Sequence, residues 1–259
     1  MRIPLFQVDA FTSRLFGGNP AAVCPLESWL EDRTMQAIAA ENNLAETAFF
    51  VGRGGRYDLR WFTPLVEVDL CGHATLASAF VIFNRLEPSL TEASFRSKSG
   101  ELRVMRSGDR LTLDFPAWPP ARREVTEAVT RALGAAPREV WESHDLMAVY
   151  DSEEDVRRLE PAMDRVAALD GFAVIATAPG RAADFVSRFF APRQGIPEDP
   201  ATGRAHCTLT PYWARRLGKP KLHAVQLSRR GGELFCEDRG ERVAIAGQAV
   251  QFLEGTIEV

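Results

Sequence analysis

The sequence has few of the features on which several classes of protein depend. Its four cysteines form no CxxC pair and its four histidines no HExxH motif, so neither a disulfide framework nor a metal site is expected. The formal net charge of −4 argues against a surface built to neutralise nucleic acid phosphates. The longest largely apolar stretch, Ala74–Phe83, is far shorter than the roughly 20 residues of a membrane-spanning helix. With no secretory signal at the N-terminus, these absences predict a cytoplasmic protein that binds neither nucleic acid nor a membrane.

What is present is a chain of 259 residues, long enough for one large domain or two small ones, and it repeats itself at about half its length. Four matches occur in the same order at offsets of 128 to 132: Arg60–Pro64 with Arg188–Pro192, Cys71–Ala74 with Thr202–Ala205, Gly100–Leu102 with Gly232–Leu234, and Gly108–Leu113 with Gly240–Ile245. The repeat predicts two similar domains, residues 1–118 and 119–259, divided near a proline-rich segment at Pro116–Ala121.

Each half is expected to contain mostly short strands and one long helix. In the first half, an apolar helix follows the strand pattern of Tyr57–Thr63 and runs from Gly72 to about Asn84. In the second half, a helix over Gly203–Leu217 follows a strand pattern in the same way. Both helices are apolar nearly all round, so each should lie buried in its own half. The predicted fold class is α+β, with two pseudo-symmetric domains that each wrap strands around a central helix.

The two helix starts, Gly72 and Gly203, occupy equivalent places in the repeat. Free N–H groups and a partial positive charge at a helix N-terminus favour bound anions. If both starts face one cleft between the domains, they would hold the carboxylate of a small substrate. His73 and Asp199 lie beside these starts and are candidate catalytic groups, although Asp199 could equally be an N-cap and His73 an ordinary first-turn residue.

Glu46 lies where a predicted helix, Trp29–Asn43, gives way to a strand. The apolar neighbours Leu44, Ala45 and Phe49 would partly desolvate its carboxylate. Such a carboxylate is suited to general acid–base catalysis, whereas a solvent-facing glutamate on a strand would need no function. The residues alone leave both interpretations open.

Several segments resemble the phenazine-biosynthesis PhzF-type family, within the diaminopimelate-epimerase-like superfamily. They run in family order along nearly the whole chain: Val8–Phe11 with Gly18–Pro20, Asn43–Phe49, Cys71–Ala77, Asp199–Gly203, and Ala205–Cys207 through Pro211–Trp213. The resemblance implies two domains that each wrap strands around a central helix, in agreement with the repeat. It also implies an isomerase that acts on a small carboxylate-bearing substrate without a cofactor or metal, and it is compatible with a homodimer.

In the phenazine enzyme of that family, a glutamate moves a proton between carbons of a dihydro-hydroxyanthranilate. The resemblance assigns this role to Glu46, with His73 and Asp199 as polar partners near the reacting carbons. Backbone amides at the helix starts would hold the substrate carboxylate. The residues implied to bind the substrate are Asn19, Ala45, Gly72, His73, Gly203 and Arg204.

Two of these residues depart from the family pattern. Ala45 and Arg204 stand where the family usually has serines that lie beside the substrate. Their absence argues against the phenazine substrate itself. Arg204 would either bind a second acidic group on a different substrate or turn outward as a surface residue.

Two other functions stay open. A racemase or epimerase of the same superfamily would use one thiol at each helix start. Cys71 stands at the first start, but the second has no cysteine, and Cys207 lies one turn further in. The other alternative is a metabolite-binding protein without catalytic activity on the same scaffold.

Overall fold

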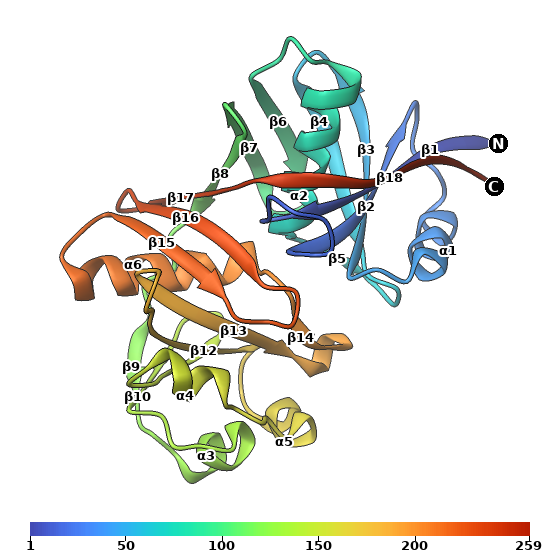
Figure 1. Cartoon of the computed structure of the whole chain (residues 1–259). Coiled ribbons are helices and arrows are strands. Elements are labelled where there is room, and N and C mark those ends of the chain that lie inside the picture. Colours follow the sequence, from blue (N-terminus) through green and yellow to red (C-terminus); the bar gives the residue numbers. More distant parts are fainter. The chain divides into compact units, whose positions relative to one another are not determined.

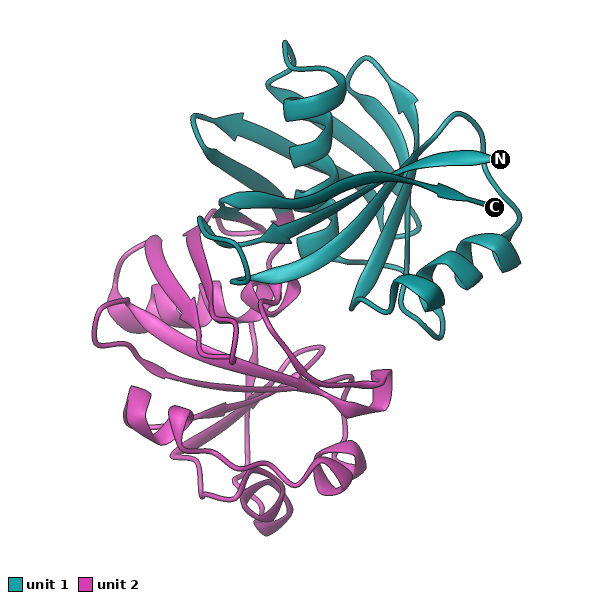
Figure 2. Cartoon of the chain, turned by 45° about the vertical axis from the view of Figure 1, so that its right-hand side comes forward, with its two compact units in different colours: residues 1–114, 245–259 teal, residues 115–244 magenta.

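The computed structural model describes residues 1–259, which divide into two compact units (Figure 2). Unit 1 comprises Met1–Asp114 and Ile245–Val259, and unit 2 comprises Phe115–Ala244. This division differs from the predicted halves 1–118 and 119–259, because the end of the chain returns to unit 1. The last strand, β18 (Ala249–Glu258), pairs antiparallel with β1 (Arg2–Ala10) from end to end. Pairing between the two ends of a chain leaves no local signal, so a boundary placed at a proline-rich turn cannot show it.

Unit 1 is a strongly curved sheet that encloses the helix α2 (Figure 1). Its strands besides β1 and β18 are β2 (Asn19–Leu26), β3 (Glu46–Arg53), β4 (Arg56–Phe62), β5 (Glu67–Val68), β6 (Glu92–Ser97), β7 (Gly100–Ser107) and β8 (Arg110–Pro116), the last two residues of β8 belonging to unit 2. Its helices are α1 (Asp32–Asn42), α2 (Gly72–Val81) and the π-helical turn η1 (Ile82–Leu86).

Unit 2 is also a mixture of strands and helices, with α6 lying along β15 and β16 (Figure 1). Its strands are β9 (Ala121–Arg123), β10 (Glu139–Glu142), β11 (Leu146–Val149), β12 (Val174–Pro179), β13 (Phe185–Ala191), β14 (Ile196–Asp199), β15 (Lys221–Gln226) and β16 (Gly232–Asp238). The strand β17 (Arg242–Gly247) begins in unit 2, and its last three residues belong to unit 1. Its helices are α3 (Glu127–Leu133), α4 (Glu153–Arg157), α5 (Met163–Ala168) and α6 (His206–Leu217), with 3-10 turns η2 (Pro192–Gln194) and η3 (Gly203–Ala205).

The two units pair their strands in the same order. In unit 1, β2 is parallel to β3, β3 is antiparallel to β4, and β4 is parallel to β6. In unit 2, β11 is parallel to β12, β12 is antiparallel to β13, and β13 is parallel to β15. In each unit a short strand follows and pairs antiparallel with the preceding long strand: β5 pairs with β4, and β14 pairs with β13. The repeated sequence matches thus fall on corresponding strands and helix starts.

The helix α2 is buried, as its composition predicts. Among its ten residues, Phe80 alone is not fully buried. The buried hydroxyls bond to carbonyls one turn back: Thr75 Oγ1 donates to Cys71 O at 2.5 Å, and Ser78 Oγ donates to Ala74 O at 2.8 Å. Because these polar groups are satisfied inside the helix, the start of α2 can lie inside the unit without a desolvation cost at these hydroxyls.

The helix α6 is buried over its first nine residues, His206 to Ala214. Its Trp213 ring stacks on Phe185 at 5.6 Å, and the indole Nε1 donates to the buried Thr177 hydroxyl at 3.0 Å. The helix ends at Gly218, whose φ of 66° favours glycine. The prediction of one buried helix in each half is therefore confirmed.

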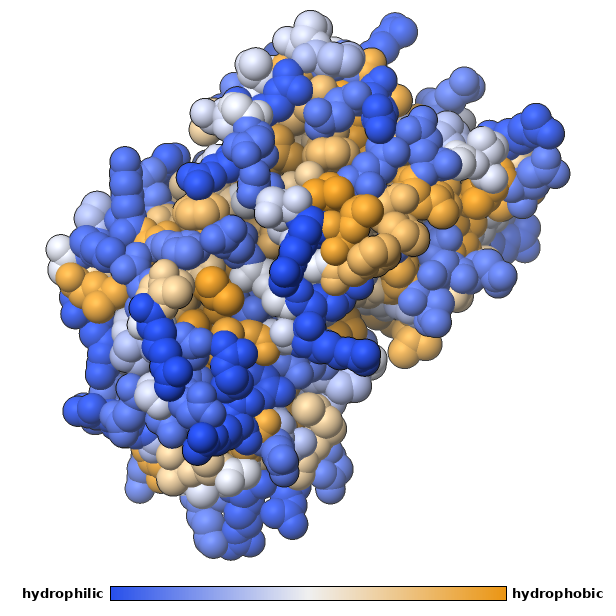
Figure 3. Space-filling model, viewed as in Figure 1, coloured by the Kyte–Doolittle hydropathy of each residue, from blue (hydrophilic) through white to orange (hydrophobic).

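Figure 3 shows a mostly hydrophilic face with apolar residues in separate patches. Among the exposed apolar side chains, Phe16 and Phe252 contact each other edge to face at 5.8 Å. No helix of the chain has the length and apolar character needed to cross a bilayer.

Candidate active site

Glu46 is the first residue of β3 and lies inside unit 1. The preceding helix α1 stops at Asn43, whose left-handed φ of 49° turns the chain, while its N–H donates to Ala39 O at 3.2 Å. The chain then enters β3, with Glu46 in register with Ala21 of β2. Only 9% of Glu46 is exposed. This burial fits the predicted desolvated carboxylate rather than a solvent-facing one.

His73 and Cys71 stand at the start of α2, next to Glu46. Cys71 is the N-cap residue and makes no capping hydrogen bond through its side chain. The Nε2 atom of His73 lies 3.1 Å from Glu46 Oε2, and the Cys71 Sγ atom lies 3.5 Å from His73 Nδ1. The three side chains are buried and come from two elements far apart in the sequence.

His73 and Glu46 form an ion-pair contact inside unit 1. The Nε2 and Oε2 atoms are 3.1 Å apart, and apart from each other neither buried atom has a hydrogen-bond partner. Buried polar atoms without partners are rare in folded proteins and often mark a functional site. A substrate group that reaches these two atoms would satisfy both.

The charges of this cluster favour a protonated imidazole. Burial by itself would lower the pKa of His73, but Cys71 and Glu46 beside the ring raise it well above its ordinary value. Burial, helped by the charge of Glu46, raises the pKa of Cys71 to about 11. Since Cys71 is then a thiol at neutral pH, the charge that favours the imidazolium there is that of Glu46.

The same three side chains also have the composition of a metal site. A carboxylate oxygen, a thiol and an imidazole nitrogen from Glu46, Cys71 and His73 lie within 4.8 Å of one another. Zinc takes these donor types. No sequence motif contains all three residues, because Glu46 comes from a different element. The predicted mechanism without a metal stays a prediction.

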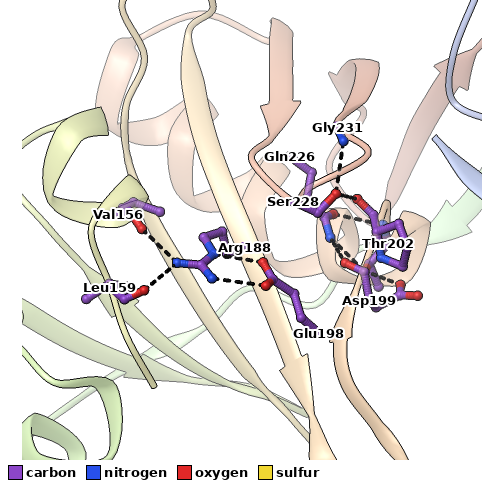
Figure 4. Close-up of polar contacts among 10 residues, drawn as sticks. Val156, Leu159, Arg188, Glu198, Asp199, Thr202, Gln226, Ser228 and Gly231 are labelled. Carbon is purple, nitrogen blue, oxygen red and sulfur yellow. Dashed lines mark hydrogen bonds and ion pairs between the residues drawn. The ribbon is translucent and has the colours of Figure 1, made fainter. Parts of the chain in front are cut away.

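In unit 2, Asp199 ends β14 and belongs to a hydrogen-bonded turn (Figure 4). Its carboxylate accepts a hydrogen bond from the Thr202 hydroxyl. Gln226, which is fully buried, joins both ends of the turn: its Nε2 donates to Asp199 O at 2.7 Å, and its Oε1 accepts from Thr202 N at 2.8 Å. The turn that leads into Gly203 is thereby held by side chains of unit 2.

Arg204 is neither a free ligand nor a plain surface residue. It follows Gly203, and its side chain is 16% exposed. Its Nη2 lies 3.2 Å from Oδ1 of Asp145, and its guanidinium lies 4.2 Å from the ring centre of Phe172 and 5.4 Å from that of Trp118. Burial raises the pKa of Asp145, while the nearby Arg204 cation opposes this rise. The charge of Arg204 is therefore engaged within unit 2.

Matching ion pairs anchor the strands that lead to both helix starts. Arg60 donates through Nε and Nη2 to the two carboxylate oxygens of Glu67 at 2.8 and 2.9 Å. Arg188 donates through the same atoms to Glu198 at 2.7 and 3.0 Å (Figure 4). Each pair ties a short strand, β5 or β14, to the longer strand before it. Such forked pairs are geometrically specific, so they fix the chain just before the site.

The predicted site residues thus fall into two groups. Unit 1 holds Asn19, Ala45, Glu46, Gly72 and His73, and unit 2 holds Asp199, Gly203 and Arg204. The sequence reasoning missed Asp145 and Gln226. A signal for Gln226 was available, because it occupies the buried phase of the alternating strand β15. Asp145 had no such signal, since its partner lies 59 residues away.

Comparison with known proteins decides the family. The family model described as phenazine biosynthesis-like protein matches residues 8–255. The chain belongs to this family. A Pseudomonas aeruginosa protein named an uncharacterized isomerase is 51% identical over 259 residues, which cover 100% of both chains. The resemblance seen in the sequence motifs is therefore confirmed.

Solved structures confirm the predicted fold of this PhzF-type chain. The crystal structure of a PhzF family protein from Enterococcus faecalis matches with a TM-score of 0.97 and 47% identity, over 100% of both chains. A hydroxyproline epimerase from Agrobacterium vitis matches with a TM-score of 0.64 and 10% identity, over 99% of this chain and 92% of that one. At that identity the second match shows the shared epimerase-like fold alone.

Proposed function

We propose that this PhzF-type protein is an isomerase that moves a proton between carbons of a small carboxylic acid, with Glu46 as general acid–base. The observation that carries the proposal is the buried Glu46 carboxylate facing His73, with neither facing atom hydrogen-bonded to any other group. Relatives named isomerases support the reaction class.

One carboxylate can perform both halves of this reaction. Glu46 takes a proton from a substrate carbon, so that a C–H bond breaks and an O–H bond forms on the carboxylate. The electron pair left on the substrate spreads into its adjoining unsaturated or carboxylate group. Glu46 then returns the proton to a second carbon, and no electrons are gained or lost overall. An imidazolium at His73 would stabilise the negative charge that develops between the two steps.

The start of α2 is the proposed anchor for the substrate carboxylate. The backbone N–H groups of Gly72 and His73 belong to the first turn of the helix, where anions are favoured. Ala45 precedes Glu46 and is partly exposed, so it would border the substrate.

From unit 2, we retain the predicted roles of Asp199, Gly203 and Arg204 in the proposal. Gln226 and Thr202 hold the turn of Asp199 in place, which supports a positioned carboxylate there. Arg204 would bind an acidic group while paired with Asp145, so its attraction for a substrate anion would be weaker than that of a free cation.

A thiol-based racemase or epimerase is the second candidate, because the Cys71 thiol contacts His73. Two observations weigh against it. Burial raises the pKa of Cys71 to about 11. At the matching position of the repeat stands Thr202, whose hydroxyl is bound to Asp199. The thiol mechanism therefore has no second thiol at that position.

Proton exchange in heavy water tests the proposal. The protein is incubated with a panel of small unsaturated carboxylic acids, and deuterium on carbon is followed by NMR. We expect Glu46→Gln to slow exchange by at least about 100-fold while the fold is kept. Glu41→Gln, on the exposed side of α1, should exchange at the wild-type rate. Undiminished exchange in Glu46→Gln would refute the role of Glu46, and binding without exchange in the wild type would favour a non-catalytic metabolite-binding protein.

A further inference from the structure

Asn19 completes a line of three side chains from three elements of unit 1. It is the first residue of β2, is fully buried, and its Nδ2 lies 3.1 Å from Nδ1 of His73. The other ring nitrogen, Nε2, lies 3.1 Å from Glu46 Oε2. One edge of the imidazole therefore faces the Asn19 amide and the Cys71 thiol, and the opposite edge faces the carboxylate that the proposed function makes the proton carrier.

The loop between β1 and β2 fixes the position of Asn19. Phe16 adopts a left-handed φ of 66°, and its N–H donates to the buried Asp9 carboxylate at 2.9 Å. Directly before Asn19, a Cβ added to Gly18 would lie 2.0 Å from Ala10 O. Bulky residues keep left-handed conformations only where their surroundings impose them. The loop thus holds the Asn19 amide in one place relative to α2.

A carboxamide can pair with either charge state of an imidazole. Its nitrogen donates to Nδ1 of a neutral ring, which places the ring proton on Nε2. After a half-turn of the amide group, its oxygen accepts from the Nδ1–H of an imidazolium. In both states the Nε2–H of His73 faces Glu46. A carboxylate in place of the amide would accept only, and an apolar side chain would do neither.

We propose that Asn19 is a positioning residue: its amide holds Nδ1 of His73 in both charge states and so keeps the proton on Nε2 directed at Glu46. This role rests on the proposed function only for its effect on turnover. The titratable groups that face the imidazole are Glu46 from β3 and Cys71 from α2, and both stay unchanged in the variants below.

Nitrogen-15 NMR of labelled histidine side chains reads the tautomer directly. The chain has four histidines, and the His73 signals are those lost in His73→Gln. In the wild type we expect neutral His73 to carry its proton on Nε2. Asn19→Asp should hold Nδ1–H and keep His73 doubly protonated to a pH at least about one unit higher. Asn19→Leu should instead give a mixture of both neutral tautomers. Asn84→Asp, on an exposed residue, is the control and should leave the His73 signals unchanged.

Kinetics separate positioning from direct substrate binding. Both Asn19 variants should lower kcat at least about tenfold with little change in KM, whereas loss of a substrate ligand would raise KM. Unchanged tautomer and titration of His73 in the Asn19 variants would overturn the proposal. If Asn19→Leu does not fold, the nearly isosteric Asn19→Asp decides alone. A wild-type protein without proton exchange would remove the proposed function but leave the NMR result intact.

Discussion

The two units begin their central helices in the same way but surround those starts with different chemistry. In unit 1, Glu46 and His73 face each other at 3.1 Å, and neither facing atom has another hydrogen-bond partner. In unit 2, Asp199, Thr202 and Gln226 bond to one another. The repeated pairing order gives the two units corresponding positions at their helix starts. The side chain present at such a position determines the chemistry that is available there. Unit 1 therefore carries the proton chemistry of the proposal, and unit 2 carries a preassembled turn.

Two buried histidines, one in each unit, sharpen this comparison. The Nδ1 atom of His206, the first residue of α6, lies 2.9 Å from the backbone carbonyl oxygen of Thr202. Burial lowers the pKa of His206 to about 4. The Cys71 and Glu46 side chains beside the ring raise the pKa of His73 instead, against the effect of burial.

The first prediction concerns the pH dependence of stability that His206 causes. In the unfolded chain, His206 binds a proton as pH falls below its ordinary pKa of 6.5. In the folded chain, it stays neutral down to about pH 4. The free energy of unfolding is therefore unaffected by His206 above pH 6.5. It falls by up to about 3 kcal/mol as pH falls from 6.5 toward 4. The sign is opposite for His73, whose stabilising contribution is present below its unfolded pKa and is lost as pH rises through the folded one.

Urea unfolding between about pH 7 and pH 4 measures this dependence. His206→Gln should flatten the fall in unfolding free energy on the acid side, and His144→Gln, at an exposed position, should not. Equal slopes for the wild type and His206→Gln would show that burial of His206 does not set the acid stability.

The second prediction uses the matching ion pairs to compare the units. Besides Glu198, Arg188 donates to the carbonyls of Val156 and Leu159 at 3.3 and 2.8 Å. Arg188→Leu should therefore cost about 2–4 kcal/mol, because a carboxylate and two carbonyls lose their donor together. Arg60→Leu, whose additional partner Asp32 is exposed, should cost about 1–2 kcal/mol.

Chemical unfolding of the two arginine variants tests the comparison. Arg103→Leu, from an exposed pair with Glu101, controls for loss of a surface arginine and should stay near wild type. A larger loss of unfolding free energy in Arg60→Leu than in Arg188→Leu would contradict the prediction that the ion pair in unit 2 stabilises the fold more than the one in unit 1.

Local patterns predicted more of this molecule than long-range contacts did. The apolar runs of α2 and α6 and the alternation of β15 are visible in the sequence, because burial leaves a periodic signal. Family motifs indicated Glu46, His73 and Asp199. The return of β18 to β1 and the pairing of Arg204 with Asp145 depend on residues far apart in the chain. No window of sequence contains both partners, so these features needed the structure.

The smallest predicted effect concerns the thiol that unit 1 has and the matching position of unit 2 lacks. Cys71→Ala removes the contact with His73 at 3.5 Å and leaves Asn19 and Glu46 in place. Because Cys71 is protonated at neutral pH, we expect the exchange rate in heavy water to stay within about threefold of wild type. Cys24→Ala, another buried cysteine of unit 1, controls for the small loss of packing.

Thiol chemistry would give the opposite result. If Cys71 carried the proton, Cys71→Ala would slow exchange by at least about 100-fold and Glu46→Gln would slow it far less. The pair of variants therefore distinguishes the carboxylate from the thiol, even though both groups touch the same imidazole. A small effect of Cys71→Ala on the exchange rate, together with a large effect of Glu46→Gln, would mean that Glu46 carries the proton. Because Glu46 lies outside the repeated segments, the second helix start would then need no thiol either.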